Sequence, residues 1–135
     1  MKKIAIVGSR RMTSYGREVI AMLMKKLKDK AEVVTIEVAG CNQEIIRQGA
    51  KKIFRGDNFE KLNEEVARYA DLLVIIEGGE KSGTILLASK FIEKGKMVYC
   101  VPGRITDRNC WACNWLISQG AGVICDIGDL TGLAE

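Results

Sequence analysis

The sequence contains no histidine among its 135 residues. Histidine is the commonest general base and the commonest metal ligand, and it completes Ser-His and Cys-His nucleophilic pairs. Its absence excludes every catalytic arrangement built on an imidazole. Any catalysis would have to rest on carboxylates, cysteine, lysine or tyrosine.

Long apolar runs and an even set of cysteines are also missing. No run approaches the ~18 residues that span a bilayer, so we expect no membrane segment. Five cysteines argue against a full disulfide framework, and no signal peptide precedes the first predicted strand. We therefore expect a cytoplasmic protein with reduced thiols. The net charge of +4 permits a polyanionic partner without requiring one.

The sequence does contain a regular alternation of apolar runs and amphipathic stretches. With 135 residues, 47% of them apolar and 28% charged, it predicts one globular domain over residues 1–135. Helices are expected between strands at residues 3–7, 33–38, 53–54, 72–76, 97–101 and 123–125. The fold class is therefore α/β: a single Rossmann-like, doubly wound domain with a mainly parallel sheet and helices on both faces.

Local patterns add detail to this prediction. The first helix should begin near Thr13 or Ser14, because both residues are good N-caps. A later helix should open at Asp57, with Glu60 completing a pattern like a capping box. In the strand at residues 33–38, the face that carries Thr35 is expected to be more exposed to solvent than the other. An acidic tail is expected after the last strand.

The common strand order 3-2-1-4-5 makes the first and fourth strands neighbours, and ligands bind where the winding reverses between them. The first loop at that point carries Gly8-Ser9-Arg10-Arg11 and Thr13 at the start of a helix. The first N–H groups of a helix lack partners, and adjacent arginines favour a phosphate over a neutral ligand. The alternative is a tight strand–helix turn with two exposed arginines.

The second loop at the same point carries Gly78-Gly79, Lys81 and Ser82-Gly83-Thr84. Its glycines and hydroxyls at a helix start also favour an anion site, and the alternative is a flexible loop with a Ser or Thr cap. Neither G-x-G-x-x-G nor P-loop spacing is present, which argues against a dinucleotide oxidoreductase and a P-loop NTPase. We therefore predict a phosphate site between the two loops and no cofactor.

Motifs in both halves resemble those of the DNA-processing protein A (DprA, or Smf) family. The opening Gly8-Ser9-Arg10, followed by Thr13-x-Tyr15-Gly16, resembles the family's GSR-x-x-T-x-YG. The second half is similar to its V-V-E-A…S-G-[ST], V-P-G and [GC]-N-x-L-I-x-x-G-A motifs, at residues 74–84, 101–103 and 113–121. These matches cover most of the chain in the family's order.

The resemblance implies a Rossmann-like domain that binds single-stranded DNA and helps hand it to a RecA-type recombinase. We expect a homodimer or a higher oligomer. Two family motifs are altered in this sequence. Asn42 stands where the family has an acid, and the family's R-N-R falls at Leu62-Asn63-Glu64, so both arginines are lost.

The wider superfamily includes small-nucleotide sensors and the nucleoside monophosphate phosphoribohydrolases of the "Lonely guy" (LOG) type, which are the alternative. Those enzymes use a P-G-G-x-G-T-x-x-E loop, which the glycines of the second loop and Thr84 echo. Leu87 stands where the enzymes need a carboxylate, and an apolar side chain cannot activate water. Glu77 or Glu80 would have to substitute. We therefore favour binding over catalysis.

Cys110 and Cys113 form a single C-x-x-C pair, which is weak support for a metal without a second pair or a histidine. Near a helix N-terminus Cys113 could instead have a lowered pKa, although buried thiols are the simpler interpretation. Trp111 and Trp115 lie four residues apart, which indicates packing or a partner surface, with base stacking as the alternative.

These patterns together predict no catalytic residue and no metal ligand. We predict that phosphate or nucleic acid is bound by residues of both loops and of the V-P-G turn: Gly8, Ser9, Arg10, Arg11, Thr13, Gly78, Gly79, Lys81, Ser82, Gly83, Thr84, Gly103 and Arg104. Arg108 would extend this track along a longer backbone.

Overall fold

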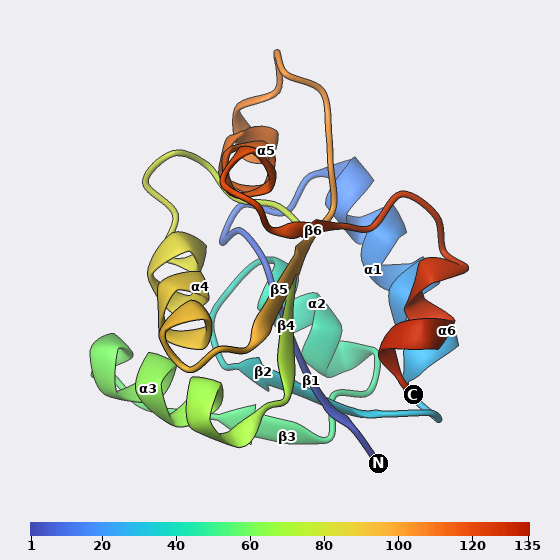
Figure 1. The fold of residues 1–135 in the computed structure, drawn as a ribbon, viewed down its shortest axis with the longest axis vertical. Helices are drawn as coiled ribbons and strands as arrows, with labels where there is room; N and C mark the ends of the chain where they lie inside the picture. The colour runs from blue at the N-terminus through green and yellow to red at the C-terminus, as the bar shows by residue number, and fades with distance from the viewer.

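A six-stranded, all-parallel sheet runs through the centre of the protein (Figure 1). The computed structural model describes residues 1–135. The strand order is β3-β2-β1-β4-β5-β6, which is the predicted order with one more strand at the edge. The strands are β1 (Lys3–Val7), β2 (Glu32–Ile36), β3 (Lys52–Phe54), β4 (Leu72–Ile75), β5 (Met97–Cys100) and β6 (Gly122–Val123).

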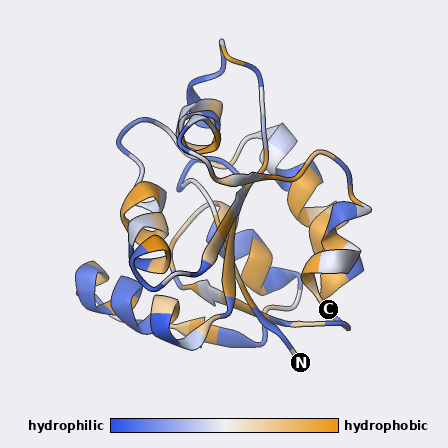
Figure 2. Ribbon diagram, in the orientation of Figure 1, coloured by the Kyte–Doolittle hydropathy of each residue, from blue (hydrophilic) through white to orange (hydrophobic).

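Helices cover both faces of this sheet (Figure 1). One face packs against α1 (Ser14–Leu27), α2 (Cys41–Arg47) and α6 (Asp129–Leu133). The other packs against α3 (Phe59–Tyr69), α4 (Thr84–Glu93) and α5 (Trp111–Ser118), with a short 3-10 helix at Arg108–Cys110 before α5. Each face therefore has its own apolar layer, and Figure 2 shows the hydrophobic residues gathered on the strands and on parts of the helices. The predicted α/β fold is confirmed.

The central strands are apolar on both faces because both faces are covered. β1 and β4 pair along their length, from Ile4 opposite Leu72 to Val7 opposite Ile75, and their side chains are buried almost throughout. Burial of apolar area at about 25 cal/mol per Å² is the main force that holds such a sheet between its helices. None of the helices is long and apolar enough to cross a membrane.

Two local predictions were wrong, and one helix was not predicted. The N-cap of α3 is Asn58, whose side chain accepts a hydrogen bond from Lys61 N, and not Asp57. The face of β2 that carries Thr35 is dry, because the Thr35 hydroxyl is fully buried and donates to Ile6 O at 2.7 Å. The predicted acidic tail contains α6, whose Leu130 is fully buried against the sheet. The N-cap of α1 is Thr13, as predicted.

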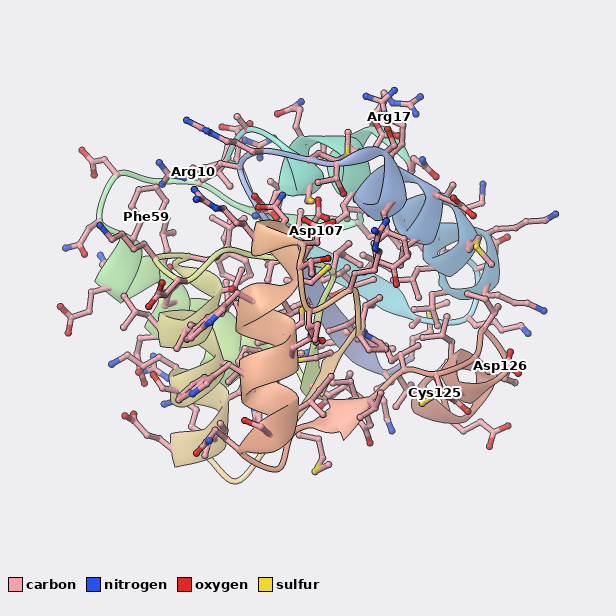
Figure 3. All side chains as sticks on the ribbon, turned by 90° about the horizontal axis from the view of Figure 1, so that it is seen from above. Arg10, Arg17, Phe59, Asp107, Cys125 and Asp126 are labelled. Carbon is pink, nitrogen blue, oxygen red and sulfur yellow. The ribbon has the colours of Figure 1, made fainter.

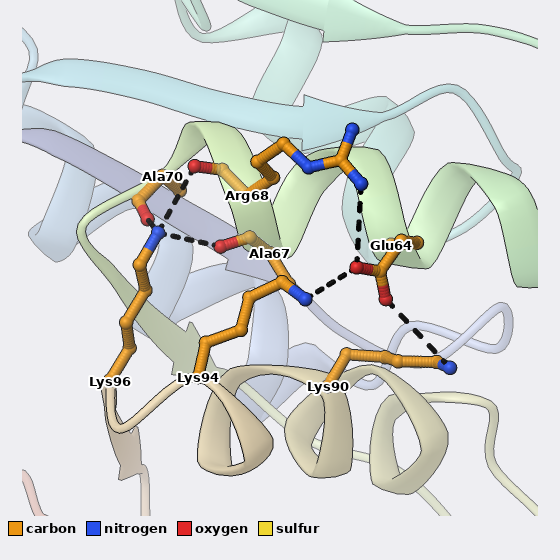
Figure 4. Close-up of polar contacts among 7 residues, drawn as sticks. All are labelled: Glu64, Ala67, Arg68, Ala70, Lys90, Lys94 and Lys96. Carbon is orange, nitrogen blue, oxygen red and sulfur yellow. Dashed lines mark hydrogen bonds and ion pairs between the residues drawn. The ribbon is translucent and has the colours of Figure 1, made fainter.

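A set of lysines ties α3 to α4 and to the turn that follows α4 (Figure 4). Glu64 of α3 pairs with Lys94 and lies 3.8 Å from Lys90 on α4. The Lys96 ammonium donates to the carbonyl oxygens of Ala67, Arg68 and Ala70 at 2.7, 3.1 and 2.7 Å. These carbonyls lie at the end of α3, where backbone acceptors have no partner within the helix. Lys96 therefore caps α3 from a distant part of the chain.

Replacement of this cap should destabilise the fold. Lys96→Met keeps most of the apolar stem but removes three charge-assisted hydrogen bonds, so we expect the free energy of unfolding to fall by about 1–3 kcal/mol. Urea denaturation measures the change. Lys90→Met, which removes only the 3.8 Å ion pair, is the control and should cost less than about 1 kcal/mol. Equal losses in the two variants would contradict the capping role.

Candidate functional site

The winding of the sheet reverses between β1 and β4. After β1 the chain enters α1 on one face, and after β4 it enters α4 on the other face. The two loops therefore separate at the carboxyl ends of neighbouring strands and leave a crevice between them. The structure places a cleft of about 1170 Å³ at this point.

Most of the residues predicted to bind phosphate line this one cleft. From the first loop they are Gly8, Ser9, Arg10 and Arg11, and from the second they are Gly79, Lys81, Ser82, Gly83 and Thr84. Arg108 also lines it. The structure places Thr13, Gly78, Gly103 and Arg104 outside the cleft. Residues separated by about seventy positions in the chain therefore share one surface, because β1 and β4 are hydrogen-bonded neighbours.

The cleft has a strong excess of positive charge. Arg10, Arg11, Lys81 and Arg108 line it, and Glu80 is the one acidic residue among the lining side chains. The Arg10 guanidinium lies 5.3 Å from the centre of the Phe59 ring, and Figure 3 shows the two side chains side by side. This cation–π contact orients Arg10 without neutralising it. The arrangement suits a ligand with several negative charges.

The N-terminus of α4 adds backbone donors to this cleft. The N-cap residue is Gly83, which has no side chain to cap the helix, and the first turn contains no acidic residue. The Ser82 and Thr84 hydroxyls lie 2.9 Å apart, and the Ser82 hydroxyl accepts from Thr84 N at 3.2 Å. The positive end of the helix dipole therefore faces the cleft without a carboxylate to offset it.

The N-terminus of α1 is different, because the protein supplies its anion. Glu77 follows β4 and is only 1% exposed. Its carboxylate accepts from Thr13 N at 2.8 Å and from the Thr13 hydroxyl at 2.6 Å, and the Cys41 thiol lies 3.4 Å away. The Thr13 hydroxyl in turn accepts from Gly16 N at 3.0 Å. The Thr13 N–H and hydroxyl are therefore already bonded within the protein. Phosphate binding by Gly8, Ser9, Arg10 and Arg11, which line the cleft, stays a prediction.

Gly16 is required by the same contact. A Cβ atom at position 16 would lie 2.3 Å from Glu77 Oε2, far inside van der Waals distance. The first turn of α1 can approach the carboxylate only because residue 16 has no side chain. In the Thr13-x-Tyr15-Gly16 motif, Gly16 thus has a packing role. Tyr15 makes a separate contact, because its hydroxyl donates to Pro102 O at 2.6 Å.

Loss of the Glu77 charge should destabilise the loop that carries the arginines. Glu77→Gln keeps the shape of the side chain but removes its charge and leaves one acceptor oxygen for the two donors of Thr13. We expect the free energy of unfolding to fall by about 1–3 kcal/mol, measured by chemical denaturation. Glu80→Gln is the matched control at an exposed position and should change it by less than about 0.5 kcal/mol. A Glu77→Gln variant with an unchanged free energy of unfolding would disprove the bracing role.

The residues outside the cleft have their polar groups engaged elsewhere. Gly78 N donates to Asn109 O at 2.7 Å, and Gly78 O accepts from Ala112 N at 2.9 Å. The amide of Asn114 bonds both backbone groups of Gly103, at 3.2 and 3.0 Å. These contacts hold the V-P-G turn and the loop after β4 against the start of α5. Arg104 is exposed.

Two asparagines that we did not predict hold the first loop in place. Asn42 is 3% exposed, accepts from Gly8 N at 2.9 Å and donates to Ile36 O at 3.0 Å. Asn109 donates to Arg11 O at 2.6 Å. Asn42 stands in one of the two altered family motifs, and that alteration is the only sign of it in the sequence. Nothing in the sequence around Asn109 indicated its contact.

The cysteines are buried, apart from Cys125. The neighbouring Cys100 thiol and burial raise the pKa of Cys113, and burial raises the pKa of Cys110. A lowered pKa at Cys113 is therefore the wrong interpretation, because the thiolate would lie in an apolar layer beside Ile75 O, which is 3.4 Å from the sulfur. No group of three or more His, Cys, Asp or Glu side chains is placed to hold a metal ion.

Thiol labelling should follow this burial. In the native protein we expect one thiol, Cys125, to react rapidly with Ellman's reagent at pH 8. The remaining thiols should react only after unfolding in guanidinium chloride. The Cys125→Ser variant should remove the rapid phase, and a rapid phase that survives this change would show that one of the other four thiols is accessible.

The fold and the cleft define a class: a doubly wound, Rossmann-like domain with a cationic crevice at its switch point. A family model described as DNA recombination-mediator protein A matches residues 49–135. The chain belongs to this family. A second model, described as NADPH-dependent FMN reductase, matches residues 1–77. That match covers the half of the chain up to Glu77 and ends before the loop that closes the cleft.

The curated relatives agree with this assignment. DNA processing protein DprA of Bacillus subtilis is 25% identical over 171 residues, covering 96% of this chain and 58% of the relative. Protein Smf of Escherichia coli is 30% identical over 64 residues, covering 47% of this chain and 17% of the relative. The chain therefore spans less than two thirds of the length of the proteins that it matches.

Solved structures show the same fold. DNA processing protein A of Streptococcus pneumoniae has a TM-score of 0.80 at 19% identity, covering 98% of this chain and 61% of that one. The Helicobacter pylori protein, solved to describe its single-stranded DNA binding mode, has a TM-score of 0.84 at 20% identity, with coverages of 98% and 80%. An FMN complex of AnUbiX is more distant, with a TM-score of 0.58 at 9% identity.

Proposed function

We propose that this protein binds single-stranded DNA, with the phosphates held in the cleft between the loops after β1 and β4. The observation that carries the proposal is the grouping of Arg10, Arg11, Lys81 and Arg108 around the N-terminus of α4, whose first turn has no acidic residue. Arginine and lysine side chains with backbone N–H groups are the usual partners of nucleic-acid phosphates. Proteins of this family process DNA, and the similar Helicobacter pylori protein binds single-stranded DNA.

Two contacts disfavour a LOG-type hydrolase. Glu77, which directly precedes the glycines of the second loop, is buried and binds Thr13. Leu87 lines the cleft but belongs to the apolar layer beneath it. Only Glu80 is left as a carboxylate at the cleft, and it lies on an exposed part of the loop. A general acid or base needs a fixed position beside the bond that breaks.

The role in the cell is also part of this proposal. The family resemblance supports a mediator that passes single-stranded DNA to a RecA-type recombinase, and a homodimer or higher oligomer as the working form. Because the chain spans 58% of the length of the Bacillus subtilis relative, these partners belong to the proposal and not to the observed structure.

Salt titration of DNA binding tests the phosphate contacts. For a dT oligonucleotide, log K should fall linearly with log salt, with a slope of about −0.7 for each phosphate contacted. Arg10→Ala and Arg108→Ala should each weaken binding and make the slope shallower by about 0.7. Arg68→Ala is the control, because it removes the same charge at the far end of α3.

Two outcomes would overturn the proposal. One is DNA binding that hardly changes between low and high salt, since it would exclude several ionic contacts. The other is tight binding of a nucleoside monophosphate that a dT oligonucleotide does not displace. The second result would favour the small-nucleotide sensor.

A further inference from the structure

The exposed side of α5 carries an uncharged aromatic stripe. Trp111 and Trp115 are each 39% exposed, and Ser118 follows one turn later on the same side. The two indole rings are stacked, with centres 5.9 Å apart and planes 6° from parallel. The opposite side of the helix, with Ala112, Cys113 and Leu116, is buried. The stack therefore stands on a fixed helix and turns outward instead of filling the core.

The stripe is continuous with the cleft. Trp111 lines the cleft, whereas Trp115 lies one turn farther along α5. Leu86 of α4, which is 66% exposed, also lines the cleft and provides a second apolar surface there. The short helix that leads into α5 begins with Arg108, one of the cationic residues of the cleft. A chain that leaves the phosphate site in this direction meets an arginine and then a stacked pair of indoles.

We propose that the Trp111–Trp115 stack is a base-stacking platform for single-stranded nucleic acid that leaves the cleft over α5. The inference rests on the proposed function and adds a second set of contacts to it, with bases instead of phosphates. Trp111 receives a base on the side toward the cleft, and Trp115 supports Trp111 from behind. Stacking on an aromatic ring is tolerant of sequence because every base has a π face.

Charge distinguishes a nucleic acid from a protein partner at this surface. α5 carries no acidic or basic residue in its first or last turn, and the cations stand beside it on the cleft. Single-stranded DNA matches this arrangement, because its charged backbone can lie against the cations of the cleft while its uncharged aromatic bases lie against α5.

Intrinsic fluorescence tests the platform directly, because Trp111 and Trp115 are the only tryptophans in the chain. We expect a dT oligonucleotide to quench and shift their emission as it binds. An abasic oligonucleotide of the same length carries the phosphates without the bases, and it should bind more weakly and leave the emission almost unchanged. This comparison separates base contacts from phosphate contacts.

Substitutions give the second readout. Trp111→Ala should weaken dT binding by about 5- to 150-fold, the range expected for loss of one stacked base, with the salt slope unchanged. Trp111→Tyr keeps a π face and should recover most of the affinity. Met22→Ala, which removes an exposed apolar side chain of α1, is the control and should bind like the parent protein. Circular dichroism verifies that each variant is folded.

The outcomes separate this inference from the proposed function. Salt-dependent binding of dT with unchanged emission, and full affinity in Trp111→Ala, would overturn the platform and leave the phosphate cleft intact. No binding of any oligonucleotide would overturn both. A drop in molecular mass by light scattering in Trp111→Ala, with DNA affinity retained, would show that the stripe joins copies of this chain and would also overturn the platform.

Discussion

The hydrogen bonds between Glu77 and Thr13 determine the geometry of the site. A carboxylate that is almost wholly buried needs strong donors, and here the backbone and hydroxyl of one residue supply them. Because Glu77 follows β4 and Thr13 precedes α1, the contact joins the two loops behind the cleft. It also places a carboxylate of the protein itself at the start of α1. The first turn of α4 has no such acidic partner, and its positive end faces the cleft.

The asparagines complete this frame. Asn42 bonds a backbone donor of the first loop and a backbone acceptor at the end of β2 with one side chain. An aspartate could not donate to Ile36 O, so the residue that replaces the family's acid is suited to this pair of contacts. At the altered R-N-R motif, Asn63 lines the cleft while Glu64 pairs with lysines of α4. Glu64 therefore links α3 to the end of α4, and the cations of the cleft come from Arg10, Arg11, Lys81 and Arg108.

Much of the fold could be predicted because it follows from periodicity. β1 is apolar from Ile4 to Val7 and β4 at every position, so the sequence indicates a central parallel sheet and hence the point where its winding reverses. The two loops could therefore be placed together. The contact between Glu77 and the start of α1 could not be predicted. Glu77 lies sixty-four positions from Thr13, and nothing in its neighbouring sequence indicates that its carboxylate is buried. The cap of α3 was not predicted because two adjacent polar residues, Asp57 and Asn58, compete for one position. The helix α6 was not predicted because it has only five residues, of which Leu130 alone is fully buried.

The two outermost strands are short, with three residues in β3 and two in β6. An unpaired strand edge is a template on which another chain can add its own backbone, and brief edges offer few such bonds. The sheet is thus poorly suited to extension from one molecule into the next or to fibril-like stacking. Any assembly of this protein would have to be built through side chains on its helices and loops.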